Sequence, residues 1–369
     1  MAMFEPNEDQ ALLKDSVAKF IERSYDEGAR KTMGAAPFDE ARWAAMAELG
    51  WLMLSFQEDD GGMQSGGATG AGDIVSLYEA LGPGLVIEPL MASSILAGGL
   101  IAGASGPARS AELLGEIASG AVRAAAALHE PRARNDLYYC ETMARREGSG
   151  WRLDGVKSLA LGGSAAQRLV LLARIEGAPG DPAGLGLFLA SADAPGITLT
   201  PYRTRDDGFA GDVALSGAVL PAKALLAGPG EAASVLALAV DQTRLAMAAE
   251  LVGLAERLAR ETAAYSMTRK QFGAPIGAFQ VLQHRMVDMA VGVETTRSLV
   301  YRAAGLADAG WSDEARAMTR RAYAHAAALA LKTAKEAVQI HGGMGMTEDV
   351  PVGRLLRRVQ TLGLLFPET

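Results

Sequence analysis

The chain of 369 residues is 49% hydrophobic and 21% charged, which suits a globular protein of two or three packed domains. Its 43 acidic and 35 basic side chains give a net charge of −8, which argues against unspecific binding to nucleic acid or an anionic membrane and leaves small molecules and proteins as expected partners. The single cysteine cannot form an internal disulfide, no apolar run reaches the roughly 20 residues that span a bilayer, and no secretory signal precedes the first helix, so a cytoplasmic location is expected.

The first third of the chain predicts helices. Asn7 and Gln10 flank two acidic residues in the arrangement of a capping box, which indicates that a helix begins there. Apolar residues continue at helical spacing through Trp43 and Met46, stop in a glycine-rich segment, and resume over residues 73–81. We therefore expect a helical N-terminal domain over residues 1–120.

Strands are predicted for the middle of the chain. Short apolar runs separated by Gly, Pro and Asp are typical of strands and turns, and they cover residues 169–175, 185–192, 197–204 and 213–219. Residues 222–230 contain a Gly-Pro-Gly sequence and indicate a linker that leads back to helices. We expect a middle β domain over residues 121–228.

Three long helices are predicted after this linker, over about residues 231–269, 279–308 and 312–341. Their apolar side chains recur on stripes that favour packing as a bundle. These stripes fill a core and by themselves indicate no function. A helical bundle domain is expected over residues 229–369.

Two segments of this bundle contain residues suited to a dinucleotide. The first presents Arg269, Gln271 and Phe272, which offer a fork of donors for a phosphate, an amide, and a flat face for an adenine or flavin ring. Its cations and Gly273 also suit an ordinary helix end with a left-handed cap. The second segment has three glycines within residues 342–345, which allow backbone N–H groups to approach a ligand or simply end a helix.

Other common sites are not indicated. The glycine fingerprint that opens a helix directly after a strand is not found, so a bound nucleotide would not follow the Rossmann pattern. The four histidines are scattered and show no metal-ligand spacing together with the cysteine. His341, beside the glycine turn, either touches a bound ring or packs in the core.

The two bundle segments resemble the acyl-CoA dehydrogenase family. Its C-terminal domain carries Tyr-x-x-x-Arg-x-Gln-Phe-Gly, then Phe-Gln, then Gln-x-x-Gly-Gly-x-Gly, and here these begin in the same order at Tyr265, Phe279 and Gln339. The Trp-rich and Gly-Gly motifs of residues 43–62, and His-Glu-Pro at residues 129–131, extend the similarity over nearly the whole chain. The resemblance implies a mostly α member of the α+β class, with a helical N-terminal domain, a β-barrel-like middle domain and a C-terminal four-helix bundle that assembles as a dimer of dimers.

The resemblance also implies a FAD site shared between subunits. It assigns to FAD seven residues of the C-terminal third: Arg269, Gln271, Phe272, Gln280, Gln339, Gly342 and Gly343. Relatives hold the flavin ring with a Thr-Glu-Pro-x-x-Gly-Ser-Asp loop and a Trp-x-Thr pair, whereas this chain has Asn135 at the serine and Leu159-Ala160-Leu161 at the pair. A leucine donates no hydrogen bond, so Asn135 is the candidate that remains in the middle domain.

Proton abstraction next to the thioester carbonyl needs a carboxylate that reaches the substrate. Most relatives place a glutamate near the C-terminus, where an ungapped alignment from Pro351 puts Phe366, with Arg358 replacing an aspartate. Other relatives place the base immediately before an arginine of the long helix, and this chain has Thr243 there. No carboxylate stands at either position.

Two nearby carboxylates are weak candidates for the base, namely Glu368 and Asp241, although Asp241 also suits a local cap or ion pair. Arg244 is a candidate for the acyl pocket. It could equally form a salt bridge to Glu250 or Asp241.

In these departures the chain resembles the small subunits of pimeloyl-CoA and steroid side-chain acyl-CoA dehydrogenases. In those enzymes two unlike chains form an α2β2 tetramer. The resemblance implies FAD-dependent α,β-dehydrogenation of an acyl-CoA thioester, with a proton leaving Cα and a hydride leaving Cβ. The partner would be a homologous subunit, or the chain itself in a homotetramer, and the electron acceptor one such as electron-transfer flavoprotein. Two alternatives are a catalytically silent structural subunit and a flavin-dependent oxidase or monooxygenase on the same fold.

Overall fold

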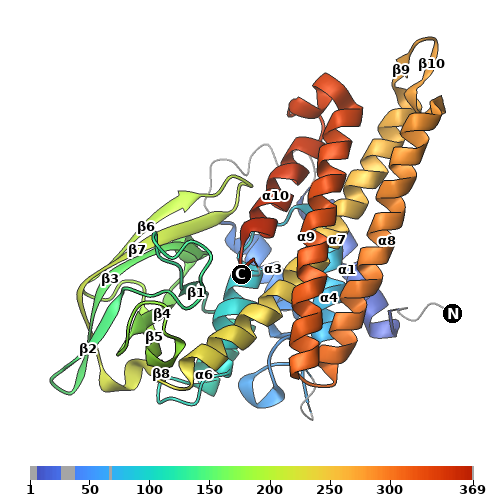
Figure 1. Ribbon diagram of the computed structural model, residues 1–369. Coiled ribbons are helices and arrows are strands. Elements are labelled where there is room, and N and C mark those ends of the chain that lie inside the picture. Colours follow the sequence, from blue (N-terminus) through green and yellow to red (C-terminus); the bar gives the residue numbers. More distant parts are fainter. Residues whose placement is uncertain (1–5, 26–37, 66–68, 368–369) are drawn as a thin grey trace. The chain divides into compact units, whose positions relative to one another are not determined.

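The computed structural model describes residues 6–25, 38–65 and 69–367 (Figure 1). Within these limits the chain folds into two compact units, each built from separate stretches of sequence. The helical unit takes residues from 1–30, 71–86 and 244–368, and the sheet unit takes residues from 31–70 and 87–243. None of the described helices combines the length and the apolar composition that a membrane span requires.

Among the described residues, six helices build the helical unit: α1 (Glu8–Ser24), α4 (Ala71–Leu81), the part of α7 (Ala232–Thr268) from residue 244 onward, α8 (Gln280–Asp308), α9 (Asp313–His341) and α10 (Val352–Leu364). A short hairpin, β9 (Lys270–Gln271) and β10 (Ala274–Pro275), connects α7 to α8. Helix α9 packs against α8 and α10, and α4 packs against α1 and α8 (Figure 1). The predicted bounds of the three long helices are confirmed to within about one residue.

Local capping determines where several of these helices begin. The Asn7 side chain accepts a hydrogen bond from the Gln10 amide, and the Gln10 side chain accepts one from the Asn7 amide. The predicted capping box is therefore confirmed. Ser312 caps α9 in the same manner through the amide of Ala315.

A buried ionic network joins three helices of this unit. Glu79 of α4 accepts hydrogen bonds from Lys14 of α1 at 2.7 Å and from Arg297 and Tyr301 of α8 at 2.6 and 2.7 Å. Gly253 of α7 allows the backbone of this helix to lie close to that of α4. A Cβ added at Gly253 would lie 2.1 Å from the Glu79 carbonyl oxygen.

The sheet unit combines short helices with a mixed sheet. Its helices are α3 (Glu40–Glu48), the π-helical turn η4 (Met91–Ala97), α5 (Gly98–Ala102) and α6 (Ala111–Ala118). Its strands are β1 (Ala124–Ala127), β2 (Met143–Glu147), β3 (Gly150–Leu161), β4 (Arg168–Arg174), β5 (Leu185–Ser191), β6 (Ile197–Arg203), β7 (Phe209–Leu220) and β8 (Leu225–Ala227). The four predicted strands correspond to β4 to β7 and are confirmed.

The strands pair in the order β6-β7-β3-β2-β4-β5-β8, and β1 adds to β4 in parallel. No pairing joins β6 to β8 among the described residues, so the sheet is open, although a barrel-like domain was expected. Residues 222–230 are also not a plain linker as predicted, because β8 within them pairs with β5. A strand of three residues is too short to show the alternating pattern that identifies strands in a sequence.

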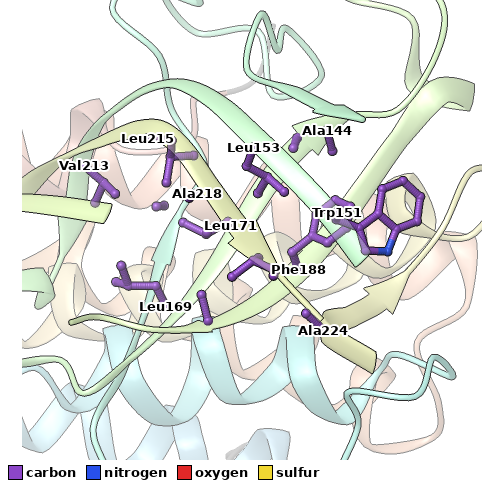
Figure 2. Packing of buried hydrophobic residues seen from close by; sticks show 14 of the residues in the cluster. Ala144, Trp151, Leu153, Leu169, Leu171, Phe188, Val213, Leu215, Ala218 and Ala224 are labelled. Carbon is purple, nitrogen blue, oxygen red and sulfur yellow. The ribbon is translucent and has the colours of Figure 1, made fainter. Parts of the chain in front are cut away.

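Side chains of six strands, β1 to β5 and β7, form the core of the described sheet unit (Figure 2). Phe188 of β5 is fully buried, and its ring contacts Trp151 of β3 edge to face, with centroids 5.2 Å apart. Leu169 and Leu171 of β4 and Val213 of β7 complete the same cluster. This core fixes β3, which carries the bulge described below.

Candidate functional site

The first bundle segment forms a hairpin beyond the end of α7 (Figure 1). Lys270–Gln271 pairs with Ala274–Pro275, and the turn residues Phe272 and Gly273 both have positive φ angles, of 53° and 83°. A two-residue hairpin favours this backbone, so Gly273 turns the hairpin and does not cap the helix as the sequence suggested. The turn leaves the Phe272 side chain 93% exposed.

The hairpin places donors and an aromatic face together at the surface. Arg269 and Gln271 are exposed, and the Phe272 ring meets the Phe279 ring edge to face at 6.2 Å. Phe279 immediately precedes α8, whose first residue, Gln280, is also exposed. The structure therefore brings together the candidates on both sides of the hairpin.

The glycine turn lies next to the end of α7 within the helical unit. The Tyr265 ring stacks on the His341 ring with centroids 4.2 Å apart, which joins the last turns of α7 and α9. His341 is buried and its Nδ1 lies 2.8 Å from the Ala337 carbonyl oxygen, in agreement with a packing role. Arg269 follows Tyr265 by one helical turn, and Gly342 follows His341 directly, so the two candidate segments meet here.

The turn itself is open to a ligand. Gly342 has a φ angle of +60°, both Gly342 and Gly343 are exposed, and a Cβ on either would meet nothing within 4 Å. Gln339, in the last turn of α9, is exposed as well. The Gly342 N–H donates to the Gln339 carbonyl oxygen and is not available to a ligand. A guanidinium, three exposed amide side chains and an exposed glycine backbone that allows close approach fit the pyrophosphate and sugar portions of a dinucleotide.

In the sheet unit, Asn135 lies on a loop between β1 and β2. Glu130 closes the base of this loop by accepting hydrogen bonds from the amides of Glu141 and Thr142, at 2.7 and 2.9 Å. Its carboxylate also pairs with Lys157 of β3 at 2.7 Å. Asn135 itself is exposed at the far end of the loop.

Strand β3 contains a bulge where relatives carry the Trp-x-Thr pair. The register with β7 shifts between Lys157 and Ala160, and Leu159 has a φ angle of +56°. The Leu159 amide donates to Asp212 at 3.1 Å, while its side chain and that of Leu161 are half-buried. Bulges commonly re-aim side chains beside functional sites, but these leucines supply no donor. Asn135 thus remains the candidate for a polar contact with a flavin from this region.

Phe366, which aligns with the catalytic glutamate of most relatives, is buried and takes part in a backbone contact. Phe366 is 5% exposed with a φ angle of +47°, and its carbonyl oxygen accepts a hydrogen bond from Arg244 Nε at 2.9 Å. Arg244 also donates to the Pro367 carbonyl oxygen at 3.1 Å. Tyr323 of α9 donates to the carbonyl oxygens of Leu362 and Leu365, and burial raises the pKa of its hydroxyl, against the opposing effect of the Arg244 charge. Arg244 and Tyr323 therefore hold the segment that follows α10.

Of the two partners that the sequence suggested for Arg244, Glu250 pairs with another arginine. Glu250 forms two hydrogen bonds with Arg358, from Nε at 2.6 Å and from an Nη at 3.0 Å. Arg358 stands where relatives carry an aspartate, so Glu250 balances the reversed charge. Asp241 is fully buried on α7 in the sheet unit, and Glu368 lies outside the described residues.

Within the described part of the chain, no three His, Cys, Asp or Glu residues are grouped as metal ligands. The buried pair of Glu130 and Lys157 was not identified as a site from the sequence. Lys157 shares the inward face of β3 with Trp151 and Leu153, and an inward lysine at alternating spacing is the signal that could have revealed it.

Comparison with known proteins gives the same assignment for both helical portions of the chain. Residues 7–121 match the model of the acyl-CoA dehydrogenase N-terminal domain, and residues 233–365 match that of the C-terminal domain. The acyl-CoA dehydrogenase FadE12 of Mycobacterium tuberculosis is 30% identical over 365 residues, which cover 96% of this chain and 91% of the relative.

Two solved structures that pair differently named chains are also similar. The ChsE4-ChsE5 complex from Mycobacterium tuberculosis matches with a TM-score of 0.83 and 27% identity over 97% of this chain and 93% of the other. The Tcur3481-Tcur3483 steroid ACAD matches with a TM-score of 0.83 and 27% identity over 96% of this chain and 92% of the other.

Proposed function

Because the chain belongs to the acyl-CoA dehydrogenase family, we propose that it acts as one subunit of a hetero-oligomer in which a homologous chain supplies the catalytic base. The reaction is FAD-dependent α,β-dehydrogenation of an acyl-CoA thioester. The observation that carries the proposal is Phe366, an apolar and buried side chain at the position aligned with the glutamate of relatives.

A cofactor surface is formed by the exposed residues around the hairpin and the glycine turn. Arg269 would neutralise the pyrophosphate of FAD, and the exposed backbone of Gly342 and Gly343, which lacks side chains, would let the cofactor approach closely. Phe272 would offer its ring face, and the amides of Gln271, Gln280 and Gln339 would satisfy ribose or adenine. Asn135 would donate to the flavin portion. Bound FAD supplies the acceptor for the hydride that leaves Cβ.

The same surface carries apolar side chains that favour cover by another subunit. Phe272, Met346, Met267 and Val281 are 93%, 81%, 69% and 65% exposed. Large exposed side chains grouped in this way mark interaction sites in soluble proteins. An α2β2 tetramer, as in the resemblance to the small subunits, would cover them and complete the cofactor site across the interface.

The substrate is proposed to be a CoA thioester with a bulky acyl chain, in view of the similarity to a steroid ACAD. In this chain Arg244 would border the acyl region, with its guanidinium holding the backbone of residues 366 and 367. Asp241 and Glu368 are the candidates for a base within this chain. A partner's carboxylate is the assignment that we favour, because residue 366 presents no group that accepts a proton.

The test combines flavin binding with flavin reduction. FAD binding to the assembly is measured by fluorescence quenching for wild type, for Arg269→Gln and for a matched exposed arginine of α7, Arg260→Gln. We expect Arg269→Gln to weaken FAD binding by roughly 10- to 150-fold, since charge-assisted hydrogen bonds contribute about 1.5–3 kcal/mol, and Arg260→Gln to have no effect.

Anaerobic addition of acyl-CoA then distinguishes the alternatives. Bleaching of the flavin only with the partner present supports the proposal. Bleaching by this chain alone overturns it, and loss of that bleaching in Asp241→Asn would identify the base. Failure to bind FAD with any partner supports a silent structural subunit, whereas rapid reoxidation of reduced flavin by oxygen supports an oxidase.

A further inference from the structure

We propose that Glu130, Lys157 and Arg174 are positioning residues for the flavin contact of this chain, because they fix the loop that carries Asn135 against the bulge of β3. The inference rests on the proposed function, in which Asn135 contacts the flavin. It concerns residues that do not themselves reach the cofactor.

Glu130 closes the loop from below. Its side chain is 3% exposed, and it accepts hydrogen bonds from the amides of Glu141 and Thr142, which lie 11 and 12 residues further along the chain. One carboxylate thereby joins the two ends of the loop. Burial by itself would raise the pKa of Glu130, but the Lys157 charge and the donated hydrogen bonds outweigh it and lower the pKa to about 2.

Lys157 connects this loop base to the bulge. Its side chain is fully buried, and its Nζ lies 2.7 Å from Glu130, 3.3 Å from Cys140 Sγ and 3.4 Å from the Leu128 carbonyl oxygen. Lys157 immediately precedes the register shift in β3. The next residue, Ser158, donates its amide to the His129 carbonyl oxygen at 2.9 Å. Loop and bulge are therefore fixed to each other by the contacts of the Lys157 ammonium group and by a backbone hydrogen bond.

Arg174 holds the second half of the loop from β4. The guanidinium is 1% exposed and forms all four of its hydrogen bonds with backbone carbonyl oxygens. Two of these bonds go to the loop, to Cys140 at 2.9 Å and to Tyr138 at 3.1 Å, and two go to the β4–β5 connection. The loop thus has buried charged anchors at its base and along its return.

A purely structural role does not account well for these charges. Burying an ion pair costs desolvation energy, and apolar side chains of similar volume often stabilise a core at least as well. Ionic anchors instead define one geometry, because each acceptor and donor must be satisfied. The residue that benefits is Asn135, whose exposed side chain lies on this loop.

The experiment measures the loop and the cofactor separately, in the assembly that binds FAD. Amide hydrogen exchange is followed in wild type, in Glu130→Gln, in the charge-free pair Glu130→Gln with Lys157→Met, and in an exposed control outside the loop, Glu112→Gln of α6. We expect both Glu130 variants to exchange the amides of Glu141 and Thr142 about tenfold faster, corresponding to one hydrogen bond, while the amides of β5 and β7 keep their protection. Unchanged loop exchange would overturn the inference.

The second readout is the dissociation constant for FAD. Glu130→Gln should weaken FAD binding by about tenfold, and combining it with Asn135→Ala should be no worse than the stronger single variant, because both act through one contact. Fully additive effects would show that Glu130 does not act through Asn135. If Asn135→Ala alone leaves FAD binding unchanged while loop exchange rises in Glu130→Gln, the assignment of Asn135 fails and the anchoring of the loop stands.

Discussion

The ion pair between Glu250 and Arg358 can be tested directly. Arg358 of α10 aligns with an aspartate of relatives, and we predict that Glu250 compensates its positive charge. Glu250 is 4% exposed and receives both hydrogen bonds from the Arg358 guanidinium. Replacement of Glu250 by Gln keeps the shape of the side chain and removes its charge. The arginine then loses its carboxylate in a mostly buried position.

The expected cost follows from the burial of the two groups. Removing one partner of a fully buried pair costs about 3–5 kcal/mol. The Arg358 side chain is 19% exposed and regains part of its hydration, which reduces the expected cost to about 2–3 kcal/mol. For a unit of this size, that corresponds to a fall of roughly 4–12 °C in the midpoint of thermal unfolding. Tyr78 lies in the same cluster, where burial and the Glu250 charge raise the pKa of its hydroxyl.

A matched control is the exposed ion pair of Arg357, which neighbours Arg358 on α10. Glu348 pairs with Arg357 at 3.0 Å, but the carboxylate side chain is 68% exposed. Glu348→Gln should change stability by less than about 1 kcal/mol, as is usual for surface pairs. Both variants are compared with wild type by differential scanning calorimetry at pH 7.

Two outcomes would refute this reasoning. The first is a loss of stability in Glu250→Gln no greater than in Glu348→Gln. The second concerns the double variant Glu250→Leu with Arg358→Met, which should recover most of the lost stability because both charges are gone. If the double variant is less stable than Glu250→Gln, packing and not charge explains the effect.

Two further predictions concern the cores of the two units. Glu79→Gln should destabilise the helical unit by about 2 kcal/mol. Burial alone would raise the pKa of Glu79, but the Lys14 charge and the donated hydrogen bonds lower it, so its contribution is present above the ordinary value of 4.5 and is lost as the pH falls. In urea unfolding, the difference in the free energy of unfolding between variant and wild type should therefore become smaller as the pH falls. A difference that does not change with pH would contradict this prediction. In the sheet unit, Phe188→Ala should cost about 3–5 kcal/mol in urea unfolding, whereas the exposed Val156→Ala should cost less than about 1 kcal/mol, and similar losses would show that the cluster is not the core.

Local signals made much of the fold predictable. Asn7 caps α1 through a capping box, and Ser312 caps α9, because these side chains satisfy amides within three residues of themselves. Long apolar stripes likewise gave the bounds of α7 to α9. The division into domains at residues 120 and 228 stays a prediction.

Features that depend on packing were not visible in the sequence. Ala124–Ala127 forms β1, although alanine favours helices, because its amides and carbonyls pair with β4 and the residues are almost fully buried. The short strand Leu225–Ala227 has no pattern of its own. Each owes its conformation to a neighbouring strand.

The candidate site shows the same limit. Exposed residues such as Arg269 and the glycines of the turn could be named from their residue types together with the resemblance to the family, since they need no partner within the chain. Glu250 and Arg358 are 108 residues apart, and Glu130 and Lys157 are 27 residues apart, so neither pairing could be deduced without coordinates. Which charged residues pair in the folded chain depends on tertiary packing, and the sequence does not show this packing.

The residues that depart from the family pattern make specific contacts within this chain. Phe366 is buried, and Arg244 binds its carbonyl oxygen, while Arg358 is balanced by Glu250. A segment that had merely lost its function would need none of these matched contacts, because an exposed tail costs no desolvation energy. The structure around residue 366 is therefore one that this chain maintains, which agrees with the proposal that a partner subunit supplies the base.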